Sequence, residues 1–330
     1  MNTEIHNAFI NAVLSDACYV DGLSDGLTGG DLSTKLGTAL TPKLANYVGD
    51  NFRIITQYTN PNLLAGGLSV TVFEEKSTGQ RYIAFRGTEP NDPRDLATDA
   101  DVETGSGLAQ AEVLDMVNWY KRATSPSGSE TVQIKPSLLP LTYASFVGNG
   151  DGSLLVNGQR YSGKYIVTGH SLGGHLTTVF SRMFAADVST SNTFNGLGVG
   201  GLLIGRQKTE FLLAQIESLL GIGSTAWPSE TRQNNYWAEH GLNVTTTEAW
   251  LQQYGLRIPG FNEESTGIPN HSMYKLTDGL ALCDVMGILD EHLTLATATA
   301  LLDAGSSTPA NSLESILDAL RKPTIGVRVI

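Results

Sequence analysis

Residues 165–174 read YIVTGHSLGG, and this stretch decides the fold class. Residues 165–168 are apolar and β-branched, which predicts a short buried strand, and a helical pattern begins near Gly174. A strand, a tight turn of small residues and a helix, in that order, hold a serine hydroxyl above the edge of a sheet. The G-x-S-x-G pattern at 169–173 therefore predicts a nucleophile at Ser171.

The same pattern occurs a second time, at 22–26, around Ser24. There it follows a helical segment and precedes further Gly and Asp residues, which predicts a loop. Because a strand-to-helix turn is what the chemistry requires, the context selects Ser171 and leaves Ser24 as an ordinary loop serine.

Strands and helices alternate around the predicted turn. We predict strands at 52–58, 68–74, 82–85, 165–168, 193–199 and 235–238, and helices at 8–20, 111–122, 175–186, 209–220, 272–288 and 313–320. Alternation over the second half is typical of a mostly parallel sheet with helices on both faces. Since no repeat or domain boundary stands out, we expect one α/β domain over residues 1–330.

Composition excludes several classes of function. The chain has 330 residues, 41% of them hydrophobic, and carries 33 acidic against 21 basic residues, a net charge of −12. This charge argues against nucleic acid and anionic membranes as partners. Two cysteines, Cys18 and Cys283, make no disulfide framework. Glu4 and His6 are unlike a signal peptide, and no run of about 18 apolar residues predicts a membrane span.

A nucleophilic serine needs a base. Of the six histidines, His271 fits best, because it follows a turn signal at 267–270 and precedes a helix downstream of Ser171. His240 is the remaining alternative. The others fit less well, since they precede the serine, sit in or just after its turn, or fall in a helical run: His6, His170, His175 and His292.

The base needs an orienting acid, expected between the serine and the histidine in the chain. The only aspartate there, Asp187, falls at the end of the helix after the serine, which is too early. A glutamate must then serve. Glu239 directly follows the predicted strand 235–238, at the sheet edge where such an acid sits. Glu263 and Glu264, in the loop before the histidine, are the alternatives.

Several motifs together carry a family resemblance. Residues 82–88, YIAFRGT, resemble the strand and Arg-Gly-Ser/Thr segment of class 3 lipases, and residues 167–174 are similar to their nucleophile motif. RGTE at 86–89 with the following aspartates Asp95 and Asp99, and NHSM at 270–273, resemble bacterial class 3-type lipases, which often carry downstream calcium-binding repeats. The likeness spans most of residues 40–286, and no such repeat occurs in these 330 residues.

The resemblance implies an α/β-hydrolase fold and a triacylglycerol lipase or carboxylesterase that works through an acyl-enzyme. It implies that Thr88 and the backbone N–H of Leu172 form the oxyanion hole and that a lid lies near 89–107. We also expect a helical C-terminal extension near 290–330. The family usually has Asp where this chain offers only glutamates.

Substrate and location follow from the same resemblance. We expect a lipid ester substrate, transient contact with a lipid interface, no stable partner, no metal or organic cofactor, and secretion without a signal peptide. A phospholipase A1 using the same site is the first alternative, although the absence of a basic cluster near the motifs favours neutral glycerides. A non-catalytic homologue that binds lipid or a partner is the second.

Overall fold

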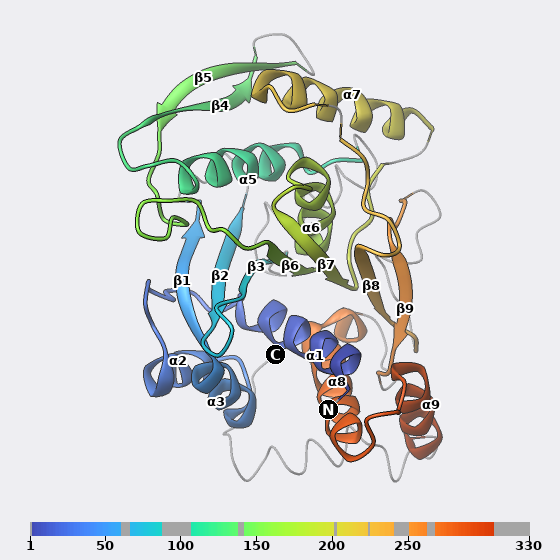
Figure 1. The fold of residues 1–330 in the computed structure, drawn as a ribbon. Coiled ribbons are helices and arrows are strands. Elements are labelled where there is room, and N and C mark those ends of the chain that lie inside the picture. Colours follow the sequence, from blue (N-terminus) through green and yellow to red (C-terminus); the bar gives the residue numbers. More distant parts are fainter. Residues whose placement is uncertain are drawn as a thin grey trace.

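A computed structural model describes residues 2–60, 67–87, 107–137, 142–200, 203–223, 225–240, 251–262 and 268–306. In this part of the chain a seven-stranded sheet lies between two layers of helices (Figure 1). The predicted α/β class, a mostly parallel central sheet with helices on both faces, is confirmed.

The order of strands in the sheet differs from their order in the chain only by a hairpin inserted between β3 and β6. The neighbours run β1 (Phe52–Thr59), β2 (Ser69–Glu75), β3 (Arg81–Phe85), β6 (Tyr165–His170), β7 (Val188–Phe194), β8 (Gln233–Ala238) and β9 (Leu256–Gly260). The first three strands are antiparallel, joined at β2 and β3 by the predicted turn 76–79, and all pairs from β3 to β9 are parallel. The carboxyl ends of β6, β7 and β8 therefore share one edge.

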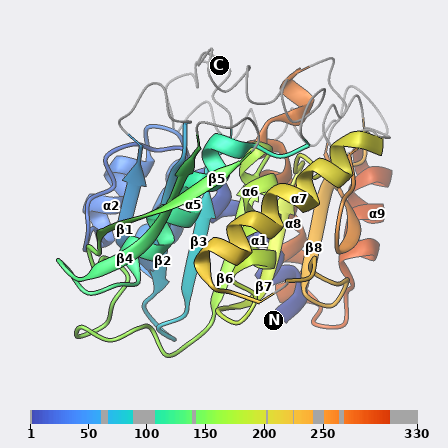
Figure 2. The same ribbon diagram turned by 90° about the horizontal axis from the view of Figure 1, so that it is seen from above.

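Alternate residues of the strands face two separate cores, as the period of two requires. Tyr82 and Ala84 of β3 pack with one group of helices, namely α1 (Thr3–Ala17), α2 (Gly29–Leu36), α3 (Pro42–Asn51), α8 (Met273–Leu289) and α9 (Leu295–Ser306). Ile83 and Phe85 pack with α5 (Gln110–Ala123), α6 (Leu172–Met183) and α7 (Leu203–Leu220). Figure 2 shows the same layers from above. On the first face, α1 and α8 pack against each other.

A hairpin lies outside the main sheet, but its turn is not at 149–152, where the Asn-Gly-Asp-Gly sequence predicts one, because its second strand ends at Asn149. β4 (Glu130–Pro136) and β5 (Tyr143–Asn149) pair with each other and cover α5, beside α7 (Figure 1). Their segment is rich in Ser, Pro and Gly, a composition that predicts loops rather than strands.

Two predicted positions need correction. The strand predicted at 193–199 is β7, which ends at Phe194; Leu197, beyond it, packs against Leu172 in a small buried cluster, so its apolar character marks a buried loop. His292 lies in the turn between α8 and α9 and not in a helix. The predicted helix at 313–320 and nearly all of the segment 89–107 lie outside the described residues. No helix in the described part of the chain is long and apolar enough to cross a membrane.

Candidate active site

Ser171 occupies the strained turn that the sequence predicts. β6 ends at His170, α6 begins at Leu172, and Ser171 between them has φ 57° and ψ −124°. A residue other than glycine keeps a positive φ only where its surroundings enforce it, and such residues cluster at functional sites. Here the Ser171 N–H donates to the carbonyl of Phe194 at 3.1 Å, and the Ser171 carbonyl accepts from the Leu197 N–H at 2.9 Å.

The glycines of the motif allow α6 to approach the sheet closely. A Cβ added to Gly173 would lie 2.1 Å from the carbonyl oxygen of Phe85, and one added to Gly169 would lie 2.3 Å from that of Gly173. Both contacts are with backbone, which cannot move aside. The beginning of α6 therefore rests against the carboxyl end of β3.

His271 meets this serine. It ends a 3₁₀ turn, Ile268–His271, just before α8, and its Nε2 lies 2.9 Å from Oγ of Ser171. Burial lowers the pKa of His271 to about 4, so the ring is neutral at pH 7 and Nε2 can accept the serine proton. Ser24, by contrast, is exposed in the loop before α2.

The other histidines have different environments. The ring of His175 lies between the carbonyl of Gly198, 2.9 Å from Nδ1, and the N–H of Ala109, 3.2 Å from Nε2, so both nitrogens are occupied. His240 lies with its Nε2 2.9 Å from Oδ1 of Asp303, and does not contact the serine. His271 is thus the histidine that the fold places against Oγ of Ser171.

The structure does not bring the carboxylate of Glu239 to His271. Among the described residues nothing hydrogen-bonds Nδ1 of His271, although this atom is buried. Glu239 is exposed at the end of β8, where its ligand atoms and those of His240 and Asp303 lie within 4.8 Å of one another. Those three side chains could together ligate a divalent cation. The orienting role of Glu239 stays a prediction, and Glu263 and Glu264 lie outside the described residues.

Two buried asparagines tie the end of β8 to the segment before His271. The side chain of Asn262 accepts from the N–H of His240 at 3.0 Å and donates to its carbonyl at 2.8 Å. Asn270 donates to the same carbonyl and accepts from Asn262 at 2.7 Å. The backbone at 239–240 is therefore held close to the residue that precedes the histidine, a network that sequence patterns do not reveal.

One predicted oxyanion donor is described. Leu172 is the first residue of α6, so its N–H has no acceptor within the helix and is available to a ligand. Thr88 lies outside the described residues, but Gly87 before it is placed: a Cβ added there would lie 3.1 Å from Cβ of Ser171. The described segment that includes β3 thus ends, at Gly87, directly beside the serine.

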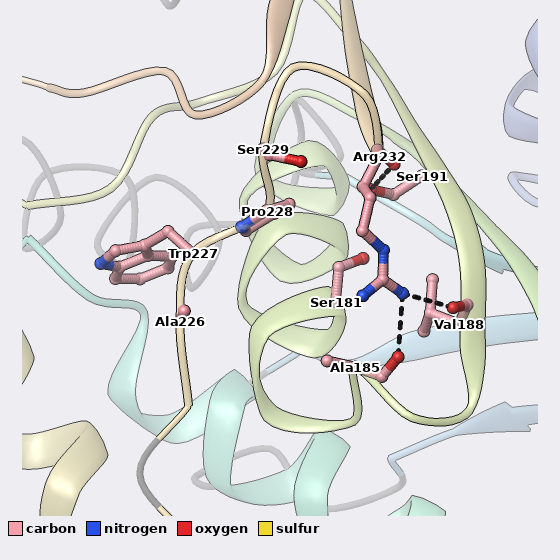
Figure 3. A pocket seen from close by; sticks show the side chains of 9 residues that line it. All are labelled: Ser181, Ala185, Val188, Ser191, Ala226, Trp227, Pro228, Ser229 and Arg232. Atoms are coloured by element: carbon pink, nitrogen blue, oxygen red, sulfur yellow. Dashed lines mark hydrogen bonds between the residues drawn. The ribbon is translucent and has the colours of Figure 1, made fainter.

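A pocket of about 180 Å³ lies at the other end of α6, among residues that follow the helix and precede β8 (Figure 3). Arg232 spans it and donates to the carbonyls of Ala185 and Val188. Because the helix has 12 residues and is about 18 Å long, this pocket is separate from the site at Ser171.

Comparisons with known proteins give structural matches only. No protein-family model matches the chain, and no curated protein is similar to it in sequence. Among solved structures, Lip2 lipase from Yarrowia lipolytica is 15% identical, with 80% of each chain covered and a TM-score of 0.40. A Rhizomucor miehei lipase–propeptide complex is 14% identical, covering 84% of this chain and 80% of that one, with a TM-score of 0.39. A triacylglycerol lipase from Penicillium expansum is 15% identical, with 79% of each covered and a TM-score of 0.35.

These matches are fungal proteins, so the bacterial origin and the calcium-binding repeats of the sequence resemblance are not tested by them. The fold class is seen in the chain itself. A parallel sheet with the serine on a strained turn between a central strand and a buried helix is the α/β-hydrolase arrangement.

Proposed function

We propose that this chain is a serine hydrolase that cleaves carboxylic esters of lipids through an acyl-enzyme, as a triacylglycerol lipase or carboxylesterase. The observation that carries the proposal is the 2.9 Å contact between Oγ of Ser171 and Nε2 of His271. These residues lie 100 positions apart in the chain, and they meet at the edge of the sheet where Ser171 has a strained backbone.

The chemistry follows from the two side chains. Oγ of Ser171 attacks the ester carbonyl carbon while its proton passes to Nε2 of His271. The oxyanion that forms accepts a hydrogen bond from the N–H of Leu172 and, in our proposal, a second one from Thr88. The carbon–oxygen bond to the alcohol breaks and the alcohol leaves with the proton from His271. Water then attacks the acyl carbon and gives one proton to Nε2. The bond between that carbon and Oγ breaks, Oγ takes the proton back from Nε2, and the acid is released. These steps need no metal or organic cofactor.

The orienting acid is the least defined part of the proposal. Glu239 remains the first candidate, because it follows β8 and the backbone of the next residue, His240, is held beside the segment of His271 by Asn262 and Asn270. Its side chain has to turn away from His240 and Asp303 to reach Nδ1. Glu263 and Glu264 are the alternatives.

Lipid esters are proposed as the substrates, with neutral glycerides ahead of phospholipids. The net charge of −12 disfavours a stable complex with an anionic membrane, whereas an uncharged oil surface carries no such penalty. The proteins matched in structure are lipases by name, and one is a triacylglycerol lipase. We propose only transient contact with the lipid surface and no stable protein partner.

Residues 89–107 are proposed as a lid, since they directly follow the proposed oxyanion donor. Opening a lid exposes apolar lining, and an oil surface offsets the cost of that exposure. A rise in rate when a triglyceride passes its solubility limit supports a lid. A curve that saturates smoothly through that limit contradicts it.

The test of the proposed function is labelling by a fluorophosphonate probe. The wild-type chain should be labelled stoichiometrically, Ser171→Ala should not be labelled, and Ser24→Ala should be labelled like the wild type. A p-nitrophenyl ester series of increasing chain length, run beside a phosphatidylcholine assay, then separates esterase, lipase and phospholipase A1 activity. A folded wild type that is neither labelled nor active contradicts the proposal and favours a non-catalytic homologue.

A further inference from the structure

His170, the residue before the proposed nucleophile, belongs to a continuous chain of hydrogen bonds. Its Nε2 lies 2.7 Å from the backbone carbonyl of His271, and its Nδ1 lies 2.9 Å from the hydroxyl of Tyr19. That hydroxyl in turn accepts the N–H of Gly87 at 3.1 Å. This series of hydrogen bonds joins three parts of the site, namely Gly87 after the end of β3, the turn at Ser171, and the segment of His271.

The donors and acceptors in this series of hydrogen bonds fit only one arrangement of protons. A backbone carbonyl can only accept, so Nε2 of His170 carries the proton that it donates to His271. In a neutral imidazole Nδ1 is then an acceptor, and the Tyr19 hydroxyl donates to it. Burial, with the neighbouring His271 adding to it, lowers the pKa of His170 to about 3, which keeps this ring neutral at pH 7.

His271 depends on its backbone contacts. Its carbonyl accepts a second hydrogen bond, from Nδ2 of Asn195 at 3.2 Å. Because Nδ1 of His271 has no hydrogen-bond partner among the described residues, its carbonyl is where the side chains of His170 and Asn195 hold it. The rings of His170 and His271 also pack together, with centroids 4.8 Å apart.

We propose that His170 is a positioning residue for the hydrolysis, holding the carbonyl of His271 so that Nε2 of that histidine stays aligned with Oγ of Ser171. Tyr19 acts one step further away, by fixing the ring of His170. The inference rests on the proposed function, since it assigns His271 as the base. An alignment role is physically reasonable, because a displacement of about 1 Å of a reacting group can cost about 100-fold in rate.

Two amide substitutions separate this role from a general need for a side chain at position 170. In His170→Gln the amide nitrogen can occupy the place of Nε2 and still donate to His271. In His170→Asn the amide is one methylene shorter, so it can face Tyr19 but cannot reach that carbonyl. Tyr19→Phe removes the hydroxyl with little change in volume and serves as an independent variant.

The measurements are kcat and KM for a p-nitrophenyl ester, with active sites counted by fluorophosphonate titration and folding checked by thermal melting. We expect His170→Asn to lower kcat per titrated site by about 100-fold, with KM little changed. His170→Gln should stay within about fivefold of the wild type, because only the contact with Tyr19 is lost. Tyr19→Phe should lower kcat less than His170→Asn.

Counting active sites keeps the test decisive even where a variant folds poorly. If His170→Asn and His170→Gln give the same kcat per site, whether reduced or equal to that of the wild type, the positioning role is wrong. Failure of the proposed function has a different signature. In that case Ser171→Ala or His271→Ala would retain hydrolysis, whatever the result at position 170.

Discussion

Asn195 reaches the backbone of His271 from the end of β7. Its Nδ2 donates to the histidine carbonyl at 3.2 Å, while its Oδ1 accepts the N–H of Ala238 at 2.9 Å. Because one partner is an acceptor and the other a donor, the orientation of the amide is defined. Asn195 also has a positive φ of 41°, which asparagine tolerates better than most residues.

Asn195→Asp is expected to lower kcat by about tenfold or more, since the donor to His271 is lost and a carboxylate oxygen faces a carbonyl. Asn192→Asp is the matched control. It makes the same change three residues earlier, within β7, where the side chain accepts from Asn234 at 3.2 Å. Steady-state kinetics per titrated active site check the result, and equal losses in the two variants would contradict it.

The three glutamates are expected to differ sharply when each is changed to glutamine. The one that orients His271 should lose about 10⁴-fold in kcat, as when the acid of a triad is replaced by its amide. The other two should stay within about twofold, as surface changes usually do. Glu239→Gln is the first variant to measure, followed by Glu263→Gln and Glu264→Gln. Wild-type rates in all three would exclude these three glutamates from the role.

The pH profile gives a second readout of the same acid. Burial alone lowers the pKa of His271 to about 4. A carboxylate at Nδ1 stabilises the charged ring and raises that pKa, so the wild-type midpoint of kcat/KM should lie above 4. Since the base works when neutral, activity falls as pH falls through the midpoint. In the glutamine variant that has lost activity, the midpoint of kcat/KM should move down toward 4. An unchanged midpoint would contradict the assignment of that glutamate to Nδ1.

Stability should decrease in mild acid. Burial lowers the folded-state pKa of His170 to about 3 and of His175 to about 4, against about 6.5 in the unfolded chain. Between the folded-state and unfolded-state pKa values only the unfolded state binds these protons. The free energy of unfolding therefore decreases as the pH is lowered, by up to about 1.4 kcal/mol per pH unit for each histidine. His6 acts oppositely, because its hydrogen bond to Asp284 raises its pKa.

Urea unfolding at pH 7 and pH 5 measures this change. Asp115 opposes the change as well, because burial raises its pKa to about 6 and it binds a proton in the folded state between pH 7 and pH 5. The two buried histidines outweigh His6 and Asp115, so the unfolding midpoint should be lower at pH 5. His6→Asn removes one opposing contribution and should make the fall steeper. A midpoint that stays constant or rises between pH 7 and pH 5 would show that the buried rings are not held neutral.

The fold was predictable where local pattern and environment agree. β6, the turn at Ser171 and α6 follow from one stretch, because an apolar β-branched run, small turn residues and a helical pattern adjoin there. β7 was misplaced because its buried residues are largely polar: Ser191, Asn192 and Thr193 are inside the protein with hydrogen-bond partners. Hydrophobic pattern cannot locate such a strand.

The candidate site was predictable for the residues whose chemistry has a local signature. Ser171 has its turn, and His271 has a turn signal before a helix. Tyr19, Asn195 and Asn270 have none, since each acts through a contact with a residue at least 30 positions away in the chain. Such residues are found only once the strand ends are brought to one edge.

The pairing of α1 with α8 has a consequence for synthesis of the protein. Tyr19 follows the first of these helices and His271 precedes the second, while the strands that separate them in the chain form the sheet beneath both. In a chain growing from its amino end, Ser171 leaves the ribosome well before His271 has been made. For the same reason α1 cannot pack against α8 until α8 has been made. Until His271 has left the ribosome, Ser171 lacks the histidine that contacts it, so the proposed ester cleavage can begin only after the chain has grown past α8.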